Sequence, residues 1–155
     1  KKIKIMVSYK FLQFEVTKSD LSEILRIENE CHYSPWSKGN FVDAINAENL
    51  FMVIKSNNMI VGYSVSLMAL DECQLLNIAV KNDHQRMGIG RMIVENIKDH
   101  CKEKKITNIF LEVRYSNSSA ISLYSKAGFN ELGVRSNYYK KRNGREDGLL
   151  MGLTI

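Results

Sequence analysis

Cysteine is scarce in this chain of 155 residues, and long apolar runs are missing. The three cysteines, Cys31, Cys73 and Cys101, are odd in number and lack CxxC spacing, so the sequence does not support a disulfide framework or a structural zinc site. No stretch approaches the ~20 apolar residues of a membrane span, and the short apolar run at 5–7 is insufficient for a signal peptide. We therefore expect reduced, mostly buried thiols and a cytoplasmic location.

Low-complexity tracts, long linkers and internal repeats are also missing from the sequence. With 45% hydrophobic and 25% charged residues, the chain has the composition of an ordinary globular protein. A domain of this length can bury roughly 70% of the surface that its unfolded chain exposes. We predict a single domain over residues 1–155, with residues 1–7 as a disordered end or a segment foreign to the native protein.

The formal net charge of +5 and the pI of about 9.1 favour acidic partners without choosing among a nucleotide, RNA and a membrane surface. The sequence shows neither an RNP-type aromatic motif nor a dense basic stripe. A non-catalytic domain that binds RNA or the ribosome is therefore the weaker alternative.

The spacing of apolar residues predicts alternating strands and helices. Asp20 and Glu23 resemble a capping box that opens a helix, and a second short helix begins at Ser37. The first of these helices should bury Leu21, Ile24 and Leu25. An Asn57-Asn58 turn predicts a hairpin between two of the expected strands. The strands are expected at residues 9–16, 50–54, 60–70, 73–80 and 108–114, with two more flanking a loop at 140–147.

Two further helices follow the glycine-containing segment QRMGIGR. One begins at Gly90, carries Ile93, Ile97 and Cys101 at helical spacing, and ends near the lysine cluster 102–105, where positive charge suits a helix C-terminus. The other covers SSAISLYSKAGF, residues 118–129, and is ended by Gly128.

The segment QRMGIGR fits neither common mononucleotide motif. A Rossmann fingerprint needs a third glycine where Ile93 stands, and a P-loop needs GK[ST] where Arg91 and Met92 stand. What remains is a strand, a glycine-containing loop and a helix N-terminus with unpaired N–H groups, which together can hold a pyrophosphate. A plain glycine turn that caps a helix is an equally good interpretation of these residues alone.

Glu112 occupies an unusual position in the strand FLEVR. Alternation places Leu111 and Val113 on one side, with Phe110, Glu112 and Arg114 on the other. A mid-strand carboxylate invites a functional explanation, because an apolar residue would pack better there. A structural partner for Arg114, or a residue at the end of the sheet, is the competing interpretation.

The order of NIAV, QRMGIGR, a long helix, FLEVR and a helix with SLYSKAGF resembles the GCN5-related N-acetyltransferase superfamily. The fuller pattern, from SPWSKGNF through HQRMGIGR and LEVR to RSNYY and GRED, looks like the RimI-type ribosomal-protein-alanine N-acetyltransferases. The match covers nearly the whole chain beyond the first ten or so residues. The resemblance implies an α/β single-domain fold with a mixed, mostly antiparallel sheet of about seven strands, splayed between strands 4 and 5, and about four helices.

The resemblance implies acetyl-coenzyme A as cosubstrate and no metal. The end of the fourth strand would pair its backbone with the pantetheine arm, like a host strand with a guest strand. The glycine loop would bind the pyrophosphate, helped by its two arginines. The expected cofactor-binding residues are Ile78, Ala79, Val80, Arg86, Met87, Gly88, Ile89, Gly90, Arg91 and Asn117.

By the same resemblance, Glu112 matches the family's general base and Tyr124 its general acid. A base is needed because an α-amine, with a reference pKa of about 7.7 to 8.0, arrives largely protonated. The implied mechanism is direct attack on the acetyl carbonyl, with the oxyanion stabilised by a strand N–H near Val80. Taken alone, Tyr124 is better explained as a core aromatic, so its role rests mainly on the resemblance, and a thiol nucleophile such as Cys101 has little support.

The implied acceptor is a protein N-terminus, most often the N-terminal alanine of a small-subunit ribosomal protein. Another protein N-terminus, a lysine or a polyamine is the alternative acceptor. Glu146 and Asp147 could attract a basic peptide. Ser136 stands where many relatives carry a second basic residue before NYY, and this difference leaves the peptide preference open. No nucleic-acid or membrane partner is expected, and the enzyme is expected to be a monomer or a weak dimer. The expected substrate-binding residues are Tyr33, Pro35, Trp36, Tyr138 and Tyr139.

Overall fold

The computed structural model describes residues 11–155, which form two compact units. The first comprises the described residues up to Val65 together with Asn77–Ile93, and the second comprises Ser66–Leu76 and Val94–Ile155. The predictions for residues 1–7, and for the start of the strand at 9–16, lie outside the described residues. None of the helices in residues 11–155 is long and apolar enough to cross a bilayer.

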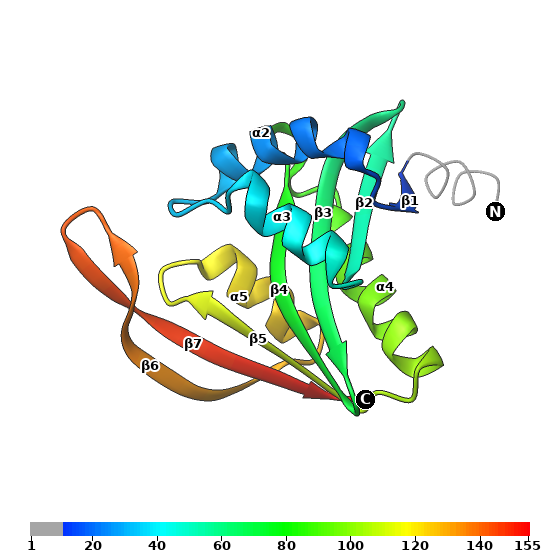
Figure 1. The fold of residues 1–155 in the computed structure, drawn as a ribbon. Helices are drawn as coiled ribbons and strands as arrows, with labels where there is room; N and C mark the ends of the chain where they lie inside the picture. Colours follow the sequence, from blue (N-terminus) through cyan, green and yellow to red (C-terminus); the bar gives the residue numbers. More distant parts are fainter. Residues whose placement is uncertain (1–10) are drawn as a thin grey trace. The chain divides into compact units, whose positions relative to one another are not determined.

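The first unit places two helices on one face of its strands (Figure 1). Its core joins apolar residues of these helices to the strands, with Phe41 lying edge-on to Tyr63 at 5.8 Å between ring centroids. Asn57 and Asn58 have φ of 51° and 62°, which confirms the predicted hairpin turn. The elements are β1 (Leu12–Glu15), η1 (Lys18–Asp20), α2 (Leu21–Cys31), α3 (Lys38–Asn46), β2 (Leu50–Ser56), most of β3 (Met59–Ala69), the end of β4 (Glu72–Val80), η2 (Asn82–His84) and the start of α4 (Ile89–Glu103).

The predicted start of the first helix needs one correction. The capping box is formed by Thr17 and Asp20, not by Asp20 and Glu23: the Thr17 N–H donates to Asp20 Oδ2 over 2.9 Å. Asp20 has helical φ and ψ and also pairs with Lys55 over 3.2 Å. Glu23 accepts instead from the Ile60 N–H, so Asp20 closes the turn that precedes the helix and Glu23 binds a strand distant in sequence. α3 begins at Lys38 with Ser37 as its N-cap, one residue after the predicted start.

The second unit is built around β5, which has a paired strand on each side. β5 pairs in parallel with β4 from Glu72 opposite Asn108 to Leu75 opposite Leu111, and the ladder stops where the splay was expected. On its other side β5 pairs antiparallel with β7. The unit consists of the end of β3, the start of β4, most of α4, β5 (Asn108–Arg114), α5 (Ser118–Lys126), β6 (Asn130–Lys141) and β7 (Gly144–Thr154).

The described residues form a seven-stranded mixed sheet in the order β1-β2-β3-β4-β5-β7-β6 and four α-helices, which confirms the predicted fold class. The apolar stripe predicted for α4 is confirmed, because Ile93, Ile97 and Cys101 are all buried.

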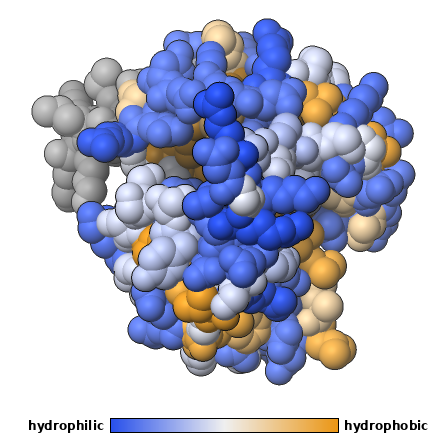
Figure 2. Space-filling view, turned by 90° about the vertical axis from the view of Figure 1, so that its left-hand side faces the viewer, coloured by the Kyte–Doolittle hydropathy of each residue, from blue (hydrophilic) through white to orange (hydrophobic). Residues whose placement is uncertain are grey.

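Figure 2 shows one face of the molecule, where hydrophilic side chains predominate and hydrophobic residues form separate patches.

The last hairpin differs from its prediction. The expected loop at 140–147 shrinks to the turn at Arg142 and Asn143, because β6 continues to Lys141 and β7 begins at Gly144. The charged residues of this segment suggested a loop. They are compatible with a strand because β6 is exposed along almost its whole length, so its side chains stay in water. Two register shifts interrupt the β6–β7 ladder, and Asn137 at the second has a φ of 51°.

Candidate active site

The end of β4 directs part of its backbone away from β3. The Lys81 N–H donates to Val61 O on β3 over 2.8 Å, so alternation turns the backbone groups of Ile78 and Val80 to the other side. The carbonyls on that side already have partners. Ile78 O lies 3.2 Å from His32 Nε2, and Val80 O accepts from Cys31 Sγ and from the Gln85 side chain over 3.3 and 3.1 Å. A guest chain would therefore find N–H groups here rather than unpaired carbonyls.

The segment before α4 has the geometry of an anion cradle. Arg86 and Gly88 have φ of 61° and 84°, which turns the chain tightly. The first helical bond is from the Met92 N–H to Gly88 O, so the N–H groups of Ile89, Gly90 and Arg91 lie in the first turn without an intrahelical carbonyl. Arg86, Met87, Gly88 and Arg91 are exposed, whereas Ile89 is buried.

Gly62 on β3 allows α4 to begin close to the sheet. A Cβ at this position would lie 3.1 Å from Ala79 O and 3.3 Å from Ile89 Cγ2. Both contacts are tighter than ordinary packing, so glycine sets how closely the buried Ile89 approaches the strands. The cradle and the end of β4 are thus held together by packing inside the first unit.

Glu112 is part of a charged and aromatic cluster in the second unit. Its side chain is 17% exposed, and Arg135 Nε lies 2.9 Å from Glu112 Oε1. The Tyr138 hydroxyl is hydrogen-bonded to Glu112, which raises the pKa of Tyr138. The Arg135 guanidinium also lies over the Tyr138 ring at 5.4 Å. Sequence reasoning missed Arg135, although it stands directly before the SNYY segment.

Arg114 and Tyr139 form a second pair beside this cluster. The Arg114 guanidinium lies 4.7 Å from the centre of the Tyr139 ring and donates to Lys140 O over 2.7 Å. Glu146 Oε2 lies 3.7 Å from Arg114 Nη1. Burial and the negative charge of Glu112 raise the pKa of Tyr139 to about 12, so its hydroxyl stays protonated at neutral pH.

Both members of the acidic pair expected to attract a basic peptide are engaged by other residues of the second unit. Glu146 accepts from the Ser116 hydroxyl over 2.7 Å and from the Ser116 N–H over 3.2 Å. The hydrogen bonds from Ser116 and the charge of Arg114 lower the pKa of Glu146. Asp147 accepts from the Asn137 N–H over 2.9 Å. These carboxylates join the hairpin to the β5–α5 connection and to the β6 bulge.

Tyr124 and Asn117 both belong to α5. Tyr124 is buried, with its ring 5.7 Å from that of Phe129, as expected for a core aromatic. Burial raises its pKa, so its hydroxyl keeps its proton, as a general acid requires. Asn117 is the N-cap of α5, and its side-chain oxygen accepts from the Ala120 N–H over 3.2 Å. Its structural task is therefore helix capping, and a cofactor contact stays a prediction.

The aromatic residues expected to bind the acceptor fall into two groups. Tyr33, Pro35 and Trp36 lie between α2 and α3 in the first unit, and the Trp36 ring packs on Phe41 at 5.1 Å. Tyr138 and Tyr139 lie on β6 in the second unit, with their rings nearly perpendicular and 4.9 Å apart.

The cysteines offer little nucleophilic character. Cys73 and Cys101 are fully buried, and burial is the main cause that raises the pKa of Cys73 to about 12. Burial also raises the pKa of Cys31, to about 11. All three are free thiols. In the part of the chain that the structure describes, no three His, Cys, Asp or Glu side chains are placed to hold a metal ion.

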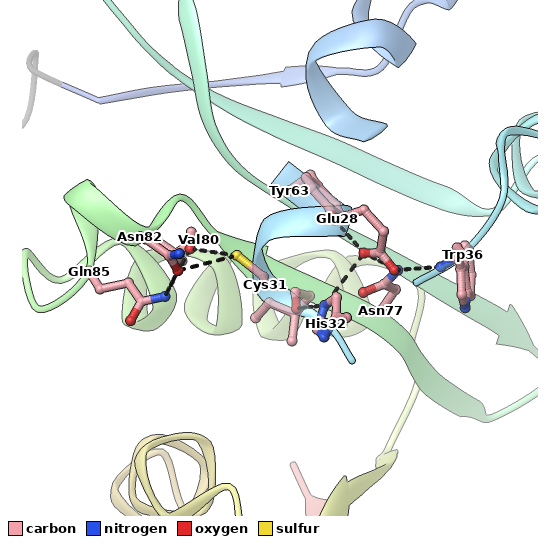
Figure 3. Close-up of polar contacts among 10 residues, drawn as sticks. Glu28, Cys31, His32, Trp36, Tyr63, Asn77, Val80, Asn82 and Gln85 are labelled. Carbon is pink, nitrogen blue, oxygen red and sulfur yellow. Dashed lines mark hydrogen bonds and ion pairs between the residues drawn. The ribbon is translucent and has the colours of Figure 1, made fainter. Parts of the chain in front are cut away.

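Sequence reasoning also missed a buried carboxylate, Glu28, which is 1% exposed (Figure 3). Tyr63 and Asn77 donate to Glu28 Oε1 over 2.5 and 3.0 Å, and the Trp36 N–H donates to Oε2 over 2.9 Å. The contact with Trp36 anchors the α2–α3 connection to the strands. A usable signal was present, because Glu28 falls at helical spacing from the buried Ile24 and beside the buried Ile27.

The chain matches the acetyltransferase (GNAT) family over residues 21–129, and it belongs to that family. It is accordingly an acyltransferase. It is 38% identical over 137 residues to the ribosomal protein bS18-alanine N-acetyltransferase of Escherichia coli strain K12, covering 88% of this chain and 93% of that protein. The resemblance to the RimI-type enzymes is confirmed by this match.

One solved structure supports this assignment, and a second shares the fold. The crystal structure of the ribosomal-protein-S18-alanine N-acetyltransferase from Escherichia coli superposes with a TM-score of 0.89 at 36% identity, covering 94% of both chains. A phosphinothricin acetyltransferase from Sinorhizobium meliloti, solved in complex with AcCoA, has a TM-score of 0.81 at 16% identity, over 94% of this chain and 89% of that one. The second likeness concerns the fold alone.

Proposed function

We propose that this enzyme transfers the acetyl group of acetyl-coenzyme A to the N-terminal α-amine of a protein, in the cytoplasm. The acceptor we favour is the N-terminal alanine of a small-subunit ribosomal protein. The observation that carries this proposal is the 38% identity, over 88% of the chain, to an enzyme named for that reaction. Identity over almost the entire length makes a shared acceptor the simplest expectation.

The cradle before α4 suits the donor. Three N–H groups in the first turn of α4, with the exposed Arg86 and Arg91, provide the donors and positive charge that a pyrophosphate requires. The backbone of Ile78 and Val80, turned away from β3, offers N–H groups to the pantetheine arm and to the acetyl carbonyl. An N–H near Val80 would then stabilise the oxyanion of the tetrahedral intermediate.

Glu112 and Tyr124 are the proposed general base and general acid. Glu112 accepts a proton from the attacking nitrogen, and Tyr124 gives a proton to the departing thiolate. The burial that keeps Tyr124 protonated supports the second assignment. Arg135 and Tyr138 hold the Glu112 carboxylate in one orientation, which reduces the entropy lost when Glu112 is aligned with the attacking nitrogen. The transfer is direct and forms no covalent enzyme intermediate.

The test is coenzyme A release with three acceptors, confirmed by the mass of the product. The acceptors are a peptide with the ribosomal N-terminal alanine, a peptide whose amine is a lysine side chain, and spermidine. Acetylation of the alanine α-amine alone supports the proposal. Thiol release only with the lysine peptide or spermidine would contradict the proposed acceptor while keeping the enzyme class.

A further inference from the structure

His32 lies at the C-terminal end of α2 with one ring nitrogen fixed between two acceptors (Figure 3). Its Nε2 atom is 3.2 Å from Ile78 O and 3.4 Å from Glu28 Oε1. A carbonyl can only accept a hydrogen bond, so Nε2 carries the hydrogen. For Nδ1, no hydrogen-bond partner exists among residues 11–155. Because the side chain is 35% exposed, it can exchange protons with water.

Glu28 is rigidly placed to orient this imidazole. Three donors besides His32 hold its carboxylate: the Tyr63 hydroxyl, the Asn77 amide and the Trp36 N–H. Burial and the hydrogen bond to Glu28 raise the pKa of Tyr63, so this hydroxyl remains a donor. A carboxylate that fixes one nitrogen of a histidine, and so leaves the other as the proton acceptor, is a recurring arrangement in acid–base catalysis.

The position of His32 connects this pair to the proposed reaction. Its Nε2 contacts the carbonyl of Ile78, two residues before Val80, where the proposed function places the acetyl carbonyl. The next four residues along the chain include Tyr33, Pro35 and Trp36, the proposed wall for the acceptor. An incoming amine that reaches Val80 along this wall would pass the exposed side of His32.

We propose that His32 Nδ1 accepts the first proton of the protonated α-amine, with Glu28 as the positioning carboxylate. This inference rests on the proposed function. It concerns a step that Glu112 alone does not explain, because an ammonium must lose one proton before attack and a second after it. The titratable groups of the network around His32 are Glu28 and Cys31 on α2 and Tyr63 on β3. Cys31 and Tyr63 have raised pKa values and are neutral at working pH.

The protons and electrons balance as follows. R–NH3⁺ gives its first proton to His32 Nδ1, which passes it to water. The neutral nitrogen forms a bond to the acetyl carbon, and the carbon–sulfur bond breaks with its electron pair going to sulfur. The nitrogen gives its second proton to Glu112, and Tyr124 protonates the thiolate; exchange with water then removes the proton from Glu112 and returns one to Tyr124. The products are R–NH–CO–CH3, coenzyme A thiol and one proton released to water.

The test is the pH dependence of kcat/KM for the alanine peptide in the full-length His32→Gln variant. The Gln amide nitrogen can occupy the place of Nε2 and keep the contacts to Ile78 and Glu28, but it cannot accept a proton. The variant should then use only neutral amine, which at pH 6.5 is about 5% of a group with a reference pKa near 7.8. We expect kcat/KM to fall below that of the unaltered enzyme by up to about 20-fold at pH 6.5 and to be nearly equal to it at pH 9.5.

The affinity for acetyl-coenzyme A should be unchanged in His32→Gln. His100→Gln is the matched control, because His100 lies on α4 with its Nδ1 atom bonded to Asn96 O. As a second variant, His32→Ala should regain activity at pH 6.5 when imidazole is added. A defect in His32→Gln that is the same at both pH values would indicate a structural role and overturn the inference, as would the lack of any defect. If the unaltered enzyme acetylates no α-amine, the proposed function itself fails.

Discussion

Replacing Glu112 by Gln should separate the catalytic role of this carboxylate from its structural one. The substitution keeps the shape of the side chain and removes its charge and basicity. Loss of a general base typically lowers the rate by 10² to 10⁴. We therefore expect kcat with the alanine peptide to fall at least ~10²-fold, a barrier increase of about 2.7 kcal/mol.

The effect on stability should be much smaller. Arg135, the ionic partner of Glu112, is 54% exposed, and a pair this open to water contributes between about 0 and 1 kcal/mol. The midpoint of urea unfolding should consequently change little, and so should the affinity for acetyl-coenzyme A, measured by calorimetry. A large loss of kcat with an almost unchanged unfolding midpoint is the expected result.

Glu146→Gln is the matched control for the loss of a carboxylate as such. Glu146 is 16% exposed, against 17% for Glu112, and it also lies beside an arginine. It should change the unfolding midpoint to a similar small extent and kcat far less than Glu112→Gln does. The assignment of Glu112 as base is refuted if Glu112→Gln retains the kcat of the unaltered enzyme from pH 6 to pH 10.

Three further predictions follow from buried groups. Tyr124→Phe should lower kcat about 10²-fold or more without weakening acetyl-coenzyme A binding, and an unchanged kcat would remove Tyr124 from the mechanism. Gly62→Ala should destabilise the protein by about 1 to 3 kcal/mol in urea unfolding, whereas Gly133→Ala, with no atom within 4 Å of the added Cβ, should not. The raised pKa of Cys73, about 12 against 9.0, means that the unfolded chain loses this proton first, so the free energy of unfolding should fall as pH rises from 9 to 12. Cys73→Ala should flatten that fall; an unchanged slope would contradict the shift.

Elements whose signal is local were predictable from the sequence. The strand β5 has the predicted bounds, because strict alternation of buried and half-buried residues leaves one register. The Asn57-Asn58 turn was predictable because asparagine tolerates positive φ. The start of α3 was predictable to within one residue because a serine N-cap accepts from an N–H three residues later. In each case the determining contact lies within a few residues.

The candidate site was predictable only in part, because most of its contacts join residues far apart in sequence. Glu23 was expected to cap its own helix, but its carboxylate binds the Ile60 N–H, 37 positions away. Glu28 accepts a hydrogen bond from Asn77, which is 49 positions away, and no local sequence pattern predicts that partner. Resemblance to a family could assign a role to Glu112. It did not predict that Arg135 would form an ion pair with Glu112.

A buried carboxylate persists in a core only if donors surround it, because an unpaired buried charge is strongly unfavourable. Glu28 meets this condition through Tyr63, Asn77 and the Trp36 N–H, and these contacts leave His32 on the solvent side of the cluster. If stability alone determined the position, an apolar residue facing Ile24 and Ile27 would serve α2 at least as well. The same carboxylate instead orients an imidazole and anchors the connection that carries Tyr33 and Trp36. That double use favours a role in positioning the acceptor over a purely structural one.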